Sequence, residues 1–190
     1  MNVYADSLIL KDALQIYFSK YHFPEGGYSK KWFSIKLGPL HIPLPNIKSR
    51  VDAVKIHDIH HILTEYNADW KGEIEIGGWE IASGCEKYTM AWLLNLGSFF
   101  IGMFLYPRSL FKAFMSGRRC ETNLYFKSDY EKFSNATVGE LRRKINFNCR
   151  ANSIQDYFLF ATWCAISILY HLSVIIVMLF VIYEVYLFLQ

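Results

Sequence analysis

Two histidines one helical turn apart are the residues best suited to chemistry in this sequence. His57 and His61 are four residues apart in a stretch with helical apolar spacing, so both imidazoles lie on one helix face. Imidazole is a common ligand of divalent metals. Glu73 is expected in the first turn of the next helix and reaches the same point if the two helices pack as a hairpin. The spacing predicts a metal site, with solvated helix histidines as the alternative.

Three more residues border this pattern. Asp58 is rotated about 100° from His57 around the helix, so it is expected at the rim, either as a metal ligand or as a group that orients an imidazole. Glu80 follows Glu73 by seven residues and lies on the same face, which makes it a candidate catalytic acid or base, with a surface charge as the alternative. His60 is expected at the surface.

The donor set restricts the metal to a divalent cation. Two imidazoles with carboxylates leave coordination positions open, which suits zinc as a Lewis acid or iron(II) in oxygen chemistry. Zinc is the favoured metal and iron(II) the alternative. The pattern differs from the zinc-peptidase motif, because Asp58 follows the first histidine and no glutamate occupies the general-base position. A peptidase is therefore a poor match.

Apolar spacing and helix-stop residues predict the elements that position the site. A helix is expected over 49–66, and Asp69 is placed to cap another that runs over 70–86. Prolines and glycines between 24 and 45 leave loops with one extended piece over 32–37. Further helices are expected over 6–20 and 137–147, the latter with capping-box spacing between Thr137 and Glu140. Residues 108–119 form a short basic amphipathic segment from which Arg118 can reach outward. It suits a membrane interface, with a surface helix packed on the core as the alternative. The predicted fold class is mainly α, with a helical metal-binding domain over residues 1–150.

A C-terminal transmembrane helix is the clearest element of all. Tyr157 to Tyr183 contains 27 residues without Asp, Glu, Lys or Arg, and about 20 helical residues cross a bilayer core. Residues 151–190 are therefore expected to form a membrane anchor. Within it, His171 is interpreted as a neutral histidine bonded to a backbone carbonyl, with a functional role as the alternative.

A second apolar stretch runs from Tyr88 to Tyr106 and has 19 uncharged residues. Asn95 and Gly97 weaken it as a lipid-facing span. It is interpreted as the central helix of the globular part, lining an apolar cavity or dipping into the leaflet, with spanning as the alternative.

Charge supports a membrane partner. The chain is 53% hydrophobic and 19% charged, with a net charge of +3, against about 25% charged in an ordinary soluble domain. Lys and Arg are concentrated before the apolar C-terminal segment and none follows it, so the positive-inside rule places the N-terminal domain in the cytoplasm. These Lys and Arg residues are not interleaved with aromatic residues, and the sequence has no zinc-knuckle spacing. Nucleic acid is therefore not an expected partner.

The metal-ligand pattern resembles that of a known family. His57-Asp58-x-x-His61, eleven residues and then Glu73 reproduces the metal-binding signature of the coenzyme Q biosynthesis protein 4 family, mostly helical proteins that act on or organise ubiquinone precursors at membranes. The similarity runs loosely from Trp32 to Phe147 and includes "GELRRKINF", similar to the family's C-terminal element. The span after Ile154 lies outside the family's usual core.

The resemblance implies a zinc or other divalent site at His57, Asp58, His61 and Glu73 beside an apolar channel for a prenylated lipid. It also implies oxidative removal of the ring carboxyl carbon of a quinone precursor, or scaffolding of a biosynthetic complex. The leading hypothesis is a membrane-anchored metalloprotein of ubiquinone biosynthesis that acts on a prenylated aromatic precursor, in the bacterial inner membrane or on the matrix side of the mitochondrial inner membrane. The alternative is a non-enzymatic, metal-stabilised scaffold that binds prenyl lipid and recruits other biosynthetic proteins.

Overall fold

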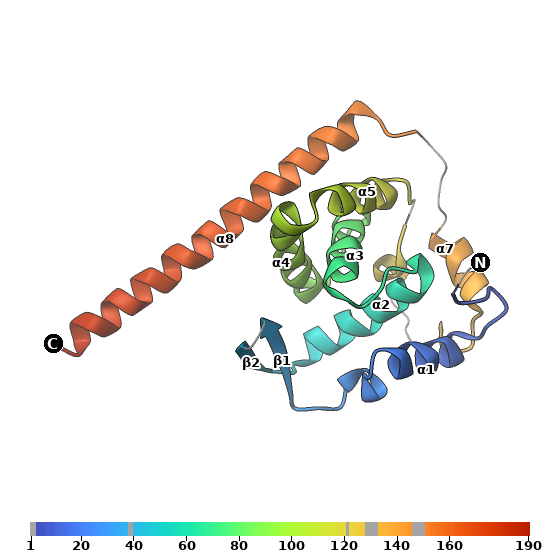
Figure 1. Ribbon diagram of the computed structural model, residues 1–190, viewed down its shortest axis with the longest axis horizontal. Helices are drawn as coiled ribbons and strands as arrows, with labels where there is room; N and C mark the ends of the chain where they lie inside the picture. The colour runs from blue at the N-terminus through green and yellow to red at the C-terminus, as the bar shows by residue number, and fades with distance from the viewer. Residues whose placement is uncertain (1–2, 38–39, 121, 128–132, 146–150) are drawn as a thin grey trace.

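The computed structural model describes residues 3–37, 40–120, 122–127, 133–145 and 151–190, and it is mainly helical, as expected (Figure 1). The α-helices are α1 (Leu10–Lys20), α2 (Lys48–Thr64), α3 (Trp70–Ser83), α4 (Thr89–Leu105), α5 (Pro107–Arg118), α7 (Val138–Ile145) and α8 (Ile154–Phe188). Two short 3₁₀ turns, η1 (Pro24–Gly27) and η2 (Leu124–Lys127), and the strands β1 (Trp32–Leu37) and β2 (Leu40–Pro45) complete the described elements.

The helices α2 and α3 form close to the expected ranges. The Asp69 carboxylate accepts a hydrogen bond from the Gly72 N–H at 2.7 Å, which confirms the predicted N-cap of α3. Both helices end earlier than expected. Glu65 has left-handed backbone with φ 61°, which ends α2, and Gly84 with φ 92° ends α3.

The segment before α2 contains a strand that the sequence did not predict. The expected extended piece is β1, which pairs antiparallel with β2 so that Trp32 lies opposite Pro45 and Phe33 opposite Leu44. The prolines of β2 argued against a strand, because proline lacks a backbone donor. A two-stranded sheet has only edge strands, where that donor is not required.

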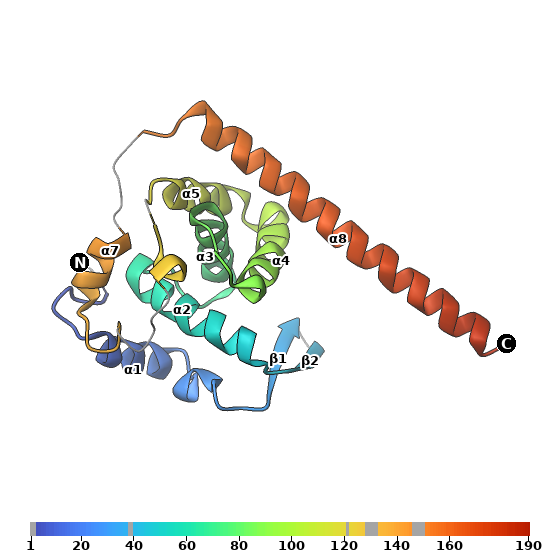
Figure 2. The same cartoon turned by 180° about the vertical axis from the view of Figure 1, so that it is seen from behind.

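The helix α3 lies at the centre of the domain, between α4 and α5 (Figures 1 and 2). Gly117 of α5 lies so close to α3 that a methyl group there would overlap the backbone carbonyl oxygen of Trp79. On α3 itself, a methyl group at Gly78 would lie 2.8 Å from Leu110. Small residues on both helices therefore allow this close packing.

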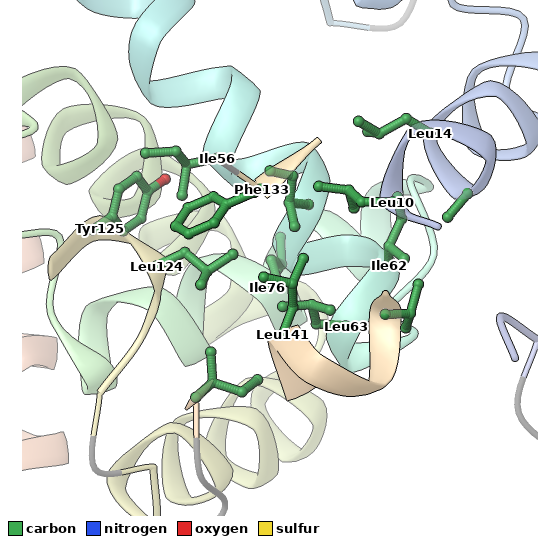
Figure 3. Close-up of a cluster of buried hydrophobic side chains, with 14 of the residues drawn as sticks. Leu10, Leu14, Ile56, Ile62, Leu63, Ile76, Leu124, Tyr125, Phe133 and Leu141 are labelled. Atoms are coloured by element: carbon green, nitrogen blue, oxygen red, sulfur yellow. The ribbon is translucent and has the colours of Figure 1, made fainter. Parts of the chain in front are cut away.

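The larger core cluster joins α2 and α3 to the N-terminal and C-terminal parts of the domain. Figure 3 shows Leu10 of α1, Ile62 of α2, Ile76 of α3 and Leu141 of α7 converging from elements far apart in the sequence, all fully buried. The Thr137 hydroxyl accepts from the Glu140 N–H at 3.2 Å at the start of α7, which confirms the capping box expected there.

The helix α4 belongs to the globular part, as predicted, but it flanks the central helix α3. It packs against α2, α3, α5 and α8. Within the described residues, α8 is the one helix long and apolar enough to cross a membrane, and α4 is shorter.

The helix α8 extends far beyond the rest of the chain in both views (Figures 1 and 2). Its first half packs on the domain, from Phe160, which contacts the rings of Phe99 and Phe114, to His171, which stacks on Phe100. The His171 ring nitrogen Nδ1 lies 2.8 Å from the Ser167 carbonyl oxygen, the backbone bond expected for this residue.

One expectation about α5 is wrong. Its apolar residues Leu110, Phe114 and Met115 are buried, as in the packed alternative, but the Arg118 side chain is only 33% exposed and is paired rather than directed into solvent. It donates to Asp156 of α8 at 3.0 Å and to the Ala82 carbonyl at 3.2 Å. Arg118 therefore ties α8 to α3 and α5.

Candidate metal site

Three side chains from α2 and α3 meet at one point. The Nε2 atoms of His57 and His61 lie 3.1 Å apart, and the Glu73 carboxylate presents one oxygen to each at 3.4 Å. Two ligands of a tetrahedral zinc with bonds of about 2.0 Å are themselves about 3.3 Å apart. The distance between the two Nε2 atoms and the distance from each Nε2 to its nearer Glu73 oxygen are close to that spacing. With one ligand atom from each residue, the three lie within 4.8 Å of one another, so His57, His61 and Glu73 can hold a metal ion.

Hydrogen bonds on the far side of each ring leave both Nε2 lone pairs facing the site. The His61 Nδ1 lies 2.9 Å from the Tyr66 carbonyl oxygen, which can only accept, so Nδ1 carries the proton. The His57 Nδ1 lies 3.1 Å from a Glu80 carboxylate oxygen and donates in the same way. Such outer partners are typical of metal-bound histidines. Two lone pairs at 3.1 Å repel each other unless a cation lies between them.

In the metal-free chain a proton can supply that positive charge. Burial lowers the pKa of His57, but the charges and hydrogen bonds of Glu80 and Glu73 outweigh burial and hold it well above its usual value. Burial raises the pKa of Glu73, yet the two histidines lower it below its usual range. A divalent metal would replace this proton and pair with the same carboxylates.

Glu80 lies at the centre of a buried polar network. Its side chain is fully buried and accepts from His57, from His60 at 2.7 Å, from Asn95 at 2.6 Å and from Tyr125 at 3.1 Å. Burial raises its pKa, but the charge of His57 and the hydrogen bonds from His57 and His60 bring it well below its usual value. The alternative of a surface charge is wrong for this residue. Because Glu80 bonds to the ring nitrogen of His57 that faces away from the site, it can orient that imidazole.

His60 is also buried, which corrects the expectation of a surface role. Its Nε2 accepts the backbone N–H of Leu124 at 3.1 Å, so its Nδ1 holds the proton donated to Glu80. The rings of Trp79 and Tyr125 lie edge-on to it, each at 5.0 Å. His60 therefore links α2 to η2 and α3.

Asp58 bonds to Tyr28 rather than joining the three converging ligands. Its Oδ2 accepts the Tyr28 hydroxyl at 2.6 Å, and it is not one of the three grouped ligands. Burial raises its pKa to about 6, against the lowering effect of the nearby His57 charge. A direct Asp58–metal bond stays a prediction from the sequence, as does catalysis by Glu80.

The site is open on the side of Glu73. The Glu73 side chain is 41% exposed and that of His57 18%, whereas His61 is enclosed. Tyr17 of α1 closes the His61 side by stacking on the ring at 5.7 Å. A ligand would therefore approach along the N-terminal end of α3.

Comparison with protein-family models, curated proteins and solved structures finds no match for this chain.

Proposed function

We propose that this chain is a membrane-anchored metalloprotein of ubiquinone biosynthesis that binds the polar ring of a prenylated aromatic quinone precursor. The observation that carries the proposal is the set of three converging ligands, His57, His61 and Glu73, in the order and spacing of the coenzyme Q biosynthesis protein 4 signature. The long apolar helix α8 supports a location at the membrane, where such a substrate resides.

The site supports a catalytic role because three ligands leave a tetrahedral position open. A bound divalent metal would supply Lewis acidity there, and zinc fits the donor set, with iron(II) as the alternative that adds oxygen chemistry. The chain's own residues would hold the metal, keep both imidazoles in one tautomer and admit the substrate ring beside Glu73. With iron(II), the proposed reaction is oxidative decarboxylation: the bond between the ring carbon and the carboxyl group breaks and releases CO₂, a hydroxyl group from water takes its place on the ring, and dioxygen takes up two electrons and two protons as hydrogen peroxide.

Replacing His61 by alanine in cells, followed by profiling of quinone precursors, tests this function. The carboxylated prenyl precursor should accumulate with His61→Ala. It should stay at its wild-type level with His41→Ala, which removes an exposed histidine from β2. An unchanged precursor profile in a His61→Ala protein that has lost its metal would contradict an enzymatic role. Reduced total quinone without that precursor, together with loss of partner enzymes from the membrane, would indicate the scaffold instead.

A further inference from the structure

An exposed tryptophan lies at the open side of the metal site. Trp70 is the first residue of α3 and is 51% exposed, and Glu73, whose side chain is 41% exposed, follows it by three residues. Residues three apart on a helix are neighbours, with Cβ atoms about 5–6 Å apart. Helical side chains also lean toward the N-terminus of their helix. The Glu73 carboxylate therefore leans back toward the turn that Trp70 begins.

The backbone that carries Trp70 is held against the rest of the domain. A methyl group at Gly72 would overlap the carbonyl oxygen of Asn67, so the first turn of α3 packs directly on the loop before it. The Asn67 side chain accepts the Tyr21 hydroxyl at 2.8 Å, which ties the same loop to α1. These contacts fix the position of Trp70 relative to Glu73.

The position of Trp70, rather than its exposure, distinguishes it. A single exposed apolar side chain is ordinary on a protein surface, and Trp32 on β1, at 61% exposed, is another example. Trp70, however, lies one helical turn from Glu73, which is the most exposed of the three converging ligands. A molecule bound at the open side of the site meets this indole first.

An aromatic substrate brings its ring to the same place. A carboxylate or phenolate oxygen held at the site keeps the ring close behind it, because only the bonds of the polar group separate the two. The ring points outward past the start of α3, since His61 is enclosed and Tyr17 stacks on its far side. Aromatic rings attract each other in stacked or edge-to-face pairs with centroids about 4.5–7 Å apart.

We propose that Trp70 is a specificity-determining residue that packs against the aromatic ring of the substrate while His57, His61 and Glu73 hold its polar group. The site then prefers a flat aromatic ring to a saturated ring with the same polar groups. This inference deepens the proposed function and rests on the part of it that brings an aromatic substrate to the metal site.

The indole N–H signals of the zinc-loaded, detergent-solubilised full chain test this contact by NMR. Trp70→Phe and Trp32→Phe assign the two signals in isotope-labelled protein. The probe is para-hydroxybenzoate, and its fully hydrogenated counterpart, hydroxycyclohexanecarboxylate, carries the same polar groups on a saturated ring. The ring current of a stacked aromatic ring moves a neighbouring indole signal upfield, whereas a saturated ring has no such current.

The expected result is an upfield shift of the Trp70 signal with para-hydroxybenzoate and a much smaller shift with the saturated acid. The Trp32 signal should not move, because its neighbour Phe33 packs on Arg50, two turns of α2 before His57. In calorimetric titrations, Trp70→Leu should weaken binding of para-hydroxybenzoate by about 2–10-fold. Affinity for the saturated acid and for zinc should stay unchanged, and Trp32→Leu should match the wild type.

Two results would overturn the ring contact and leave the proposed function intact. One is binding of para-hydroxybenzoate without a shift of the Trp70 signal, which is measured on the wild-type chain and needs no folded Trp70→Leu protein. The other is an equal loss of affinity for both acids in Trp70→Leu. A zinc-loaded wild-type chain that binds neither acid would instead contradict the proposed function, because the site would not take an aromatic acid at all.

Discussion

The Glu80→Gln substitution tests whether a buried carboxylate holds His57 in the tautomer that a metal requires. Glu80 accepts from His57, Asn95 and Tyr125 at one oxygen and from His60 at the other. Glutamine has only one carbonyl oxygen, so its NH₂ group must replace one of these acceptors. The substitution keeps the shape of the side chain and removes its charge.

The hydrogen bonds leave glutamine no satisfactory orientation. If its carbonyl takes the position with three donors, its NH₂ faces the His60 Nδ1–H. His60 cannot move that proton to Nε2, because Nε2 accepts from the Leu124 N–H. The opposite orientation places the NH₂ group against three donors. One buried unsatisfied group lowers the free energy of unfolding by about 1–3 kcal/mol.

Metal affinity should also fall, because Glu80 orients the His57 ring. Loss of an outer partner of a metal-bound histidine typically weakens binding by about 10–100-fold, equivalent to about 1.4–2.7 kcal/mol. Zinc titration of the metal-depleted, detergent-solubilised full chain against a chelating dye measures the affinity, and thermal unfolding measures the stability.

The matched control is Glu75→Gln on the same helix. Glu75 pairs with Lys71 at 2.9 Å in an i,i+4 bridge whose lysine is 51% exposed, so its loss should cost about 1 kcal/mol and leave zinc affinity unchanged. Wild-type zinc affinity and thermal stability in Glu80→Gln would refute the assignment of Glu80 as the group that positions His57.

Two further substitutions test the packing and capping that support the site. Gly117→Ala should lower the free energy of unfolding by about 1–3 kcal/mol, because its methyl group meets the Trp79 carbonyl. The control Gly97→Ala, whose methyl group has nothing within 4 Å, should raise the free energy of unfolding by about 0.5–1 kcal/mol. Equal effects of the two substitutions in chemical denaturation would contradict the close α3–α5 packing. Asp69→Ala should cost about 1 kcal/mol by removing the cap bond to Gly72, and an unchanged denaturation midpoint would show that the cap contributes nothing.

The three converging ligands could be predicted from the sequence because their geometry is local. The i,i+4 spacing fixes His57 and His61 on one face, and the Asp69 cap fixes where α3 begins, which puts Glu73 in its first turn. The length of the apolar C-terminal segment was equally direct evidence for α8.

The buried network around Glu80 could not be predicted, because its partners come from distant elements. Asn95 belongs to α4 and Tyr125 to η2, 15 and 45 residues beyond Glu80. Only the seven-residue spacing from Glu73 indicated that Glu80 lies on the same face. His60 had no local signal for burial, since its enclosure depends on η2 and on Trp79 of α3.

Elemental analysis of the purified full chain tests the central claim most directly, because the proposed function depends on a metal at His57, His61 and Glu73. The account predicts one divalent metal ion per chain in the wild type and its loss in His57→Ala and His61→Ala proteins whose circular dichroism shows retained helix. A wild-type chain without stoichiometric metal after purification and zinc titration, or alanine variants that keep their metal, would contradict it.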